Sequence, residues 1–200
     1  MKRKNTTWIL TVAGIAATTL VMQSCGGPST ANGEEQSSML NSESASAEST
    51  MSEEAKDQHF MDDATTLCLE QIDMGNLAIQ KSNMKEVKEL GALMVKDHAN
   101  MLVEIQDMAA KKSITIPKSI SEADKKDFNT LSEKYGQEFD KSYCDRMVRK
   151  HREAVNQFER ASEHAADTDI KAWASNSLPM MRNHLDQSIS CQKKCDKVIL

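Results

Sequence analysis

Helix-periodic apolar patterns in this sequence contain three histidines, His98, His151 and His184. A fourth such pattern carries Gln71 near its middle. Imidazole is the commonest protein ligand for zinc, copper, iron and nickel near neutral pH. Three imidazoles from different helices would therefore form an open site for a transition metal ion. Further candidate ligands for such a site are Gln71, Asp140 and Cys68.

The same polar residues also fit a structural role. Buried histidines are ordinarily satisfied by hydrogen bonds, and Tyr143, Asp140 or Asp97 could supply them. Cys68 suits a small buried thiol as well as an extra soft ligand. The sequence leaves open both a metal site and a structural or proton-exchanging polar layer.

Counting residues from the expected turns places the three histidines at one height. With turns near Asn83 and Asp167, His98 lies about 15 residues from its turn, and His151 and His184 lie about 16 and 17 from theirs. At a rise of about 1.5 Å per residue, the three fall within roughly 3 Å of one level, and Gln71 lies less than about 8 Å from it.

The elements that must position these residues are four long amphipathic helices. Apolar residues recur at steps of three and four, and no stretch alternates long enough to compete as a strand. The four stripes are Phe60, Ala64, Leu67, Gln71, Met74 and Ala78; Val87, Gly91, Met94, His98, Met101, Ile105 and Met108; Cys144, Met147, His151, Ala154, Phe158, Ala161 and Ala165; and Ile170, Ala174, Ser177, Met181, His184, Ser188, Cys191, Cys195 and Val198. They predict an all-α bundle.

Local signals mark the ends of these helices. Asn83, with Glu86 three residues later, is a candidate cap for the second helix. Residues 114–117 stop that helix, and a shorter amphipathic helix is expected from about Ser121 until the pair 135–136. Pro179 should kink the last helix about one turn before His184.

The composition agrees with a helical protein. Seven glycines, three prolines and 4% aromatic residues argue against sandwiches, barrels and glycine-looped nucleotide folds. A formal net charge of −5 argues against a nucleic-acid binder.

The first 25 residues have the layout of a secretory signal. A cationic start precedes an uncharged apolar run that is too short to span a membrane comfortably. Cys25 directly follows that run and precedes two glycines, an arrangement that resembles a bacterial lipobox. We therefore expect residues 1–24 to be removed and Cys25 to carry lipid, which would hold the protein on a membrane surface.

Residues 25–55 are expected to form a disordered acidic tether. Residues 26–55 contain eight Ser, six Glu and no Lys or Arg, too few apolar groups to offset the entropy of ordering. The signal holds three of the 25 basic residues and none of the 30 acidic ones, so the rest of the chain carries −8, of which the tether holds −6. The folded domain is expected over residues 56–200.

Several segments of this domain resemble, in order and spacing, a bacterial family of uncharacterised ferritin-like envelope proteins, a domain of unknown function often labelled as outer-membrane proteins. The segments are "HFMDDA", "ALMVKDH", "IP", "FDKSYCDRMVRKH" and "LPMMRNHL", within about residues 58–190. The resemblance implies a ferritin-like up-down four-helix bundle with a short extra helix in the crossover between helices two and three. It also implies that His98, His151, His184, Asp140, Tyr143 and Pro179 stand at the family's motif positions.

Two positions depart from that family. Lys150 stands where the family usually has an acid, and Gln71 where it often has a Glu. The residues three before the histidines are Val95, Val148 and Met181, so the Glu-x-x-His pairs of di-iron proteins are missing. Ferroxidase activity is therefore not expected.

Two further cysteines can be paired from their positions. Cys144 and Cys191 lie about 23 and 24 residues from the second turn, so they share a level on adjacent helices. A disulfide between them is one expectation in an oxidising compartment. Cys191 and Cys195 are one helical turn apart, which suits a metal or a partner better than a disulfide.

Two functions follow from these features. The first is a non-enzymatic binding or stress-related module, anchored by its N-terminal lipid in the bacterial cell envelope, at the outer membrane facing the periplasm or the exterior. The alternative is a metal-binding or metal-dependent redox protein using the three histidines. No cofactor is fixed by the sequence beyond a candidate transition metal ion, and no protein or small-ligand partner is identified.

Overall fold

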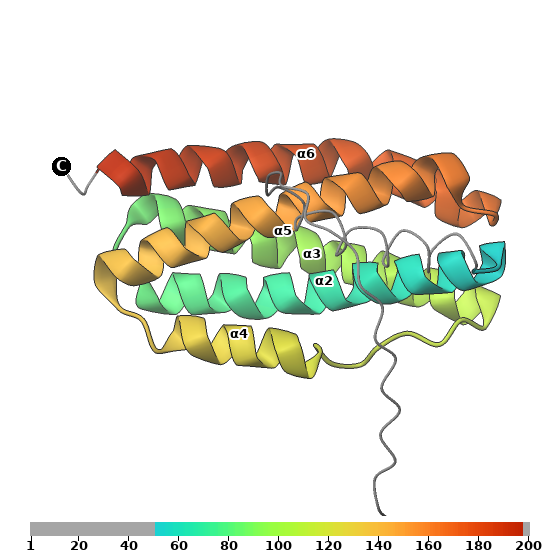
Figure 1. The fold of residues 1–200 in the computed structure, drawn as a ribbon, viewed down its shortest axis with the longest axis horizontal. Helices are drawn as coiled ribbons and strands as arrows, with labels where there is room; N and C mark the ends of the chain where they lie inside the picture. The colour runs from blue at the N-terminus through green and yellow to red at the C-terminus, as the bar shows by residue number, and fades with distance from the viewer. Residues whose placement is uncertain (1–50, 198–200) are drawn as a thin grey trace, which may run out of the picture. The chain divides into compact units, whose positions relative to one another are not determined.

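The computed structural model describes residues 51–197, which form five helices and no strand (Figure 1). The helices are α2 (Glu53–Lys81), α3 (Lys85–Lys112), α4 (Glu122–Ser132), α5 (Gly136–His164) and α6 (Thr168–Lys197). Within the described residues, no helix is both long and apolar enough to cross a membrane. The expected signal, the lipidation site at Cys25 and residues 25–50 of the expected tether lie outside the described residues.

The four long helices lie side by side, and α4 lies along the outside (Figure 1). α2 packs mainly on α3, and α5 mainly on α6, across connections of three residues each. The longer connection between α3 and α5 contains α4, which contacts α2 and α5. The expected all-α bundle and its short extra helix are therefore present.

Side-chain caps explain where several helices begin. Ser52 Oγ accepts a hydrogen bond from the Ala55 amide, so α2 starts at Glu53, within the last residues of the expected tether. Ser121 caps α4 in the same way. The expected cap at Asn83 does not form: α3 begins after Met84, whose side chain makes no capping bond.

A pair of glycines lets α2 and α3 approach closely. A Cβ atom added to Gly75 would lie 2.6 Å from the carbonyl oxygen of Gly91, and one added to Gly91 would lie 2.7 Å from that of Gly75. Only a residue without a side chain fits at either place. Gly75 lies one turn from Gln71, so the contact fixes the spacing of these two helices close to the polar level.

The buried apolar residues form two clusters with the polar residues between them. One contains Cys68, Met101, Ala154 and Met181, and the other contains Met74, Met94, Met147 and Cys191. On each long helix the polar residue comes between these members. The polar residues are Gln71, His98, His151 and His184, all 0% exposed. A buried polar layer therefore divides the core of the bundle.

Candidate metal centre

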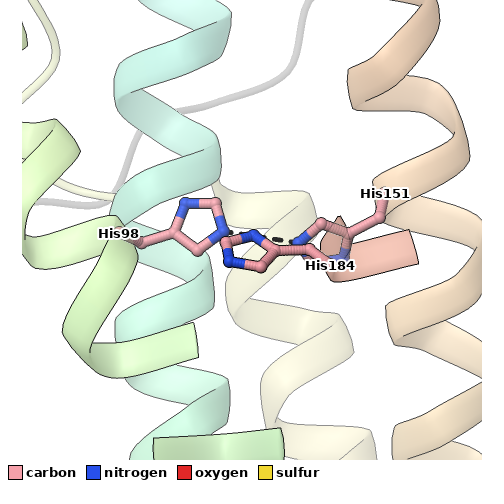
Figure 2. Close-up of side chains that lie close together, drawn as sticks. All are labelled: His98, His151 and His184. Carbon is pink, nitrogen blue, oxygen red and sulfur yellow. Dashed lines mark hydrogen bonds between the residues drawn. The ribbon is translucent and has the colours of Figure 1, made fainter. Parts of the chain in front are cut away.

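Three imidazoles meet in the middle of the bundle: His98 from α3, His151 from α5 and His184 from α6 (Figure 2). We call them the histidine cluster. Their ring centroids are 5.2 to 5.6 Å apart. One ring nitrogen from each residue lies within 4.8 Å of the corresponding nitrogen of the other two. The spacing of the stripes brings the rings together because each stripe faces the same axis.

Two of the rings are held by oxygen acceptors. His151 Nδ1 lies 2.9 Å from the Met147 carbonyl oxygen, and His184 Nε2 lies 2.9 Å from the Asp97 carboxylate. Because a carbonyl or an ionised carboxylate only accepts, these nitrogens carry the protons of the neutral rings. The lone pairs are therefore on His151 Nε2 and His184 Nδ1. Metal-bound histidines are oriented by acceptors of this kind.

The third ring approaches one of these lone pairs. His98 Nε2 lies 3.3 Å from His151 Nε2. His98 Nε2 donates this bond, because the His151 nitrogen carries no proton. Zinc–imidazole bonds of about 2.0–2.1 Å place two tetrahedral nitrogen ligands roughly 3.3–3.4 Å apart. The observed separation therefore already suits a shared ion.

Burial keeps all three rings neutral near pH 7. Desolvation, reinforced by the neighbouring imidazoles, lowers the pKa of His98 well below its usual value of 6.5. Desolvation and His184 lower the pKa of His151 to about 3. Desolvation also lowers the pKa of His184, although Asp97 opposes this shift. Neutral imidazole is the form that binds metals.

The other candidate ligands lie differently. Asp140 and Cys68 do not belong to the histidine cluster, and Asp140 precedes His151 by 11 residues of α5, about 16 Å along the helix. Gln71 is fully buried, and neither atom of its amide has a hydrogen-bond partner among residues 51–197. Tyr143, another expected partner of the histidines, has a buried hydroxyl that is also unpartnered there.

Three cysteines form a second group near the end of the bundle where α3 begins. The Sγ atom of Cys144 lies 2.8 Å from that of Cys191 and 3.5 Å from that of Cys195. We call these residues the thiol cluster. All four cysteines among residues 51–197 are free thiols. The expected disulfide between Cys144 and Cys191 therefore stays a prediction.

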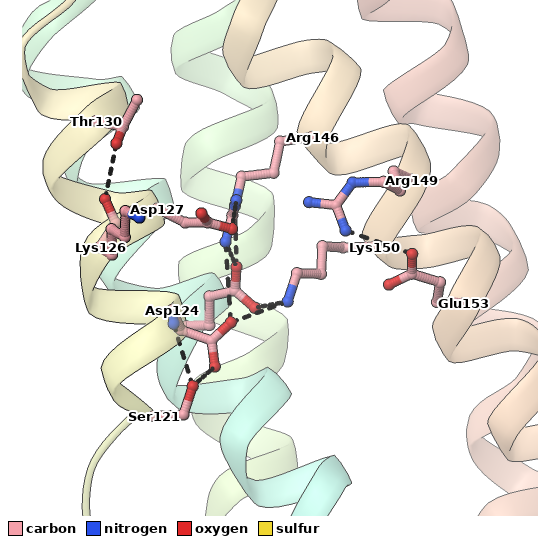
Figure 3. Close-up of polar contacts among 10 residues, drawn as sticks. Ser121, Asp124, Lys126, Asp127, Thr130, Arg146, Arg149, Lys150 and Glu153 are labelled. Atoms are coloured by element: carbon pink, nitrogen blue, oxygen red, sulfur yellow. Dashed lines mark hydrogen bonds and ion pairs between the residues drawn. The ribbon is translucent and has the colours of Figure 1, made fainter. Parts of the chain in front are cut away.

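A charged network joins α2, α4 and α5 away from these clusters (Figure 3). Glu70 is 1% exposed and forms ion pairs with Arg146 and with Lys150, whose Nζ lies 2.7 Å from its carboxylate. Asp127 and Asp124 of α4 pair with the same two cations. This network was not predicted from the sequence, although its charged residues stand directly beside the apolar stripes. The departure at Lys150 therefore serves the attachment of α4.

Comparison with known proteins finds one family. The family model described as a domain of unknown function, DUF4142, matches residues 41–190. No curated protein and no solved structure matches the chain.

Proposed function

The chain belongs to the DUF4142 family, and we propose that it is a metal-binding protein of the bacterial cell envelope, held at a membrane surface by lipid on Cys25. The histidine cluster binds one transition metal ion inside a ferritin-like, up-down four-helix bundle. The protein binds or sequesters the ion rather than oxidising iron.

The observation that supports a metal site is the meeting of three buried imidazoles whose ring nitrogens are not all hydrogen-bonded among residues 51–197. The polar atoms of a structural layer are hydrogen-bonded to protein groups or to ordered water. Here His98 Nδ1 and His184 Nδ1 have no partner among residues 51–197. An ion bound by one nitrogen from each ring would use the lone pairs of His184 Nδ1 and His151 Nε2 and replace the contact between His98 and His151. The proton of His98 would then lie on Nδ1, which frees Nε2 to bind the ion.

The ligand set favours a transition metal ion of intermediate softness. Three neutral imidazoles suit zinc, copper, nickel or iron(II), and they leave a coordination position open. The cluster contains no carboxylate, whereas di-iron sites of ferritin-like proteins need Glu-x-x-His pairs and two further glutamates. Val95, Val148 and Met181 occupy the positions where those glutamates would precede the histidines.

The arrangement of the helices supports the ferritin-like topology. Two hairpins, α2–α3 and α5–α6, are joined by one long connection that contains α4. One long crossover between hairpins is the connectivity of ferritin-like bundles.

Metal titration of the full-length protein, purified in detergent without a histidine tag, tests this function. Cobalt(II) is a suitable probe because its d–d absorption reports nitrogen ligands, while sulfur ligands add intense charge-transfer bands. We expect one cobalt bound by nitrogen per chain. This equivalent should be lost in the variant His98→Gln/His151→Gln, with the helical circular dichroism retained.

The matched control removes two other histidines. His59 and His164 are exposed, at 59% and 73% of their side chains, so His59→Ala/His164→Ala should keep the nitrogen-bound cobalt. Equal cobalt binding in both double variants would refute the site. Wild-type protein that binds no cobalt through nitrogen would refute it without any variant.

The lipid anchor has a separate test. Cys25→Ala should move the protein from the membrane fraction to the soluble fraction, because one acylated residue at the N-terminus would be its attachment. Cys68→Ala is the control, since Cys68 is buried in the bundle. An unchanged membrane fraction for Cys25→Ala would contradict lipid anchoring.

A further inference from the structure

The thiol cluster brings four sulfur atoms together inside the bundle. Cys144 comes from α5, and Cys191 and Cys195 come from successive turns of α6. Their ligand atoms lie within 4.8 Å of one another, and all three residues are buried. The thioether sulfur of Met84 lies 3.9 Å from Cys195 Sγ. Such a concentration of soft donor atoms is more than helix packing requires.

The surroundings of the thiol cluster are mainly apolar. Leu90, Phe139 and Met147 belong to the same buried cluster of side chains. Burial raises the pKa of Cys195 to about 11, and both its hydrogen bond to Cys191 and burial raise the pKa of Cys144. The hydrogen bond that Cys144 donates to Cys191 instead lowers the pKa of Cys191. Cys144 and Cys195 are therefore the thiols that stay protonated near pH 7. A bound cation would stabilise their thiolate forms in a site where water cannot.

A surface cavity reaches the cluster. It has a volume of about 220 Å³, and Cys191 lies in its wall. Glu86 and Glu89 of α3 also line it, so two carboxylates stand at its sides together with Lys194 of α6. A small cation can therefore reach Cys191 without unfolding of the bundle.

We propose that Cys144, Cys191 and Cys195 bind one soft monovalent cation, Cu(I), with the thioether of Met84 beside it. Thiolate and thioether donors select Cu(I) over the harder divalent ions. Three thiolates around a low-coordinate ion suffice, whereas structural zinc takes four ligands. Each thiol that binds exchanges its S–H bond for an S–Cu bond and releases its proton to solvent. No electron is transferred.

The positions of the sulfurs need little change. Metal–sulfur bonds of about 2.3 Å would place three sulfurs in one plane roughly 4 Å apart. The Sγ atom of Cys144 lies 2.8 Å from Cys191 and 3.5 Å from Cys195, so small rotations of the cysteine side chains would open the space. This site is separate from the histidine cluster and does not depend on it.

Anaerobic titration of the full-length protein with Cu(I), in competition with a chromogenic Cu(I) chelator, tests the proposal. We expect one Cu(I) per chain with a sulfur coordination shell in copper X-ray absorption. Cys191→Ser and Cys195→Ser should each lose the sulfur-bound copper. Cys68→Ser is the matched control, because Cys68 is equally buried but lies outside the thiol cluster, and it should keep the copper.

Three results would overturn the site. The first is equal Cu(I) binding by Cys191→Ser and wild type, and the second is a nitrogen-only shell in the wild type, which needs no variant to fold. The third is a Cys144–Cys191 disulfide in protein isolated without reductant. The variant His98→Gln/His151→Gln should keep the sulfur-bound copper, so failure of the histidine site and failure of this one give different results.

Discussion

The histidine cluster and the thiol cluster share helices α5 and α6 but lie in different surroundings. On α5, Cys144 precedes His151 by seven residues, and on α6, Cys191 follows His184 by seven. Seven residues are about two turns, or roughly 10 Å along each helix. The buried stripes of α5 and α6 therefore carry imidazoles at the middle of the bundle and thiols near one end.

The two clusters differ in how their side chains are held and reached. Fixed oxygen acceptors orient His151 and His184, whereas apolar packing surrounds the thiols. Cys191 lies in the wall of a surface cavity, while the histidines are fully buried. The comparison shows that one bundle carries oriented imidazoles and, beside a surface cavity, a group of thiols at successive levels of its core.

The largest expected effect is a loss of stability when the charged network is broken, without a change in either cluster. Glu70→Ala would leave Arg146 and Lys150 without their buried partner and should lower the free energy of unfolding by about 3–5 kcal/mol. Denaturant unfolding measures this loss. Both metal stoichiometries should stay unchanged in native buffer, since the candidate ligands of the two clusters lie on α3, α5 and α6 and none lies on α4.

The matched control for Glu70 is Glu153, which pairs with Arg149 where both side chains are about half exposed (Figure 3). Glu153→Ala should cost less than about 1 kcal/mol. Equal losses for the two variants would show that burial of the Glu70 carboxylate does not strengthen its pairing.

Acid should destabilise the protein through the histidine cluster. Because the folded pKa of His151 is about 3, against 6.5 in the unfolded chain, the unfolded state takes up protons first as the pH falls below 6.5. His151 alone should cost about 2 kcal/mol at pH 5. Unfolding measured at pH 7 and pH 5 should show this loss, and His151→Gln should reduce it.

A rise in pH above 9 should lower the stability of the fold through the thiol cluster. The pKa of Cys195 is raised to about 11 in the folded protein against 9.0 in the unfolded chain, so the Cys195 thiol ionises first in the unfolded state as the pH rises above 9. Cys195→Ser should flatten the alkaline side of the stability profile and leave the acid side unchanged. A change on the acid side would contradict this assignment.

Removing the acceptor of His184 should weaken only the histidine cluster. Asp97→Ala leaves the ring without its carboxylate, and loss of such a partner typically costs about 10–100-fold in metal affinity. Cobalt titration measures this change, and Cu(I) binding by the thiols should not move. Asp107→Ala, at an exposed position of the same helix, is the control that should leave cobalt affinity unaltered.

The smallest effect is expected beside the thiol cluster. The Tyr143 hydroxyl is buried and has no partner in the part of the chain that the structure describes. Because an unpaired buried hydroxyl does not stabilise the fold, Tyr143→Phe should change the free energy of unfolding by less than about 1 kcal/mol, toward greater stability. A clear loss of stability in denaturant unfolding would contradict this prediction.

The helices and the meeting of the histidines were predictable from the sequence. A 3–4 stripe fixes which residues face the axis of a bundle, and counting from the turns fixes their height. These two rules place His98, His151 and His184 together. They also place Cys144 and Cys191 at one level, where the structure puts their sulfurs 2.8 Å apart.

Side-chain directions and partners were not predictable in the same way. The stripe does not say that His184 turns one nitrogen to Asp97, or that the Gln71 amide is left without a partner. Nor does it show that Cys195 joins Cys144, because that contact depends on rotamers at the end of the core. The prediction of a cap at Asn83 was wrong because the residue types at 83 and 86 do not determine which residue of the three-residue connection is the last before α3 begins. The N-cap residue of α3 is Met84.

The contact between Gly75 and Gly91 limits how an ion bound as we propose could reach the buried imidazoles. Where two backbones touch, no side chain can swing aside to admit an ion. The α2–α3 hairpin should therefore behave as a rigid wall. The slow step of ion loading or release is expected at a helix–helix interface whose contacts are made by side chains, such as that between α3 and α6. Substitutions at that interface should therefore change the rate of ion exchange.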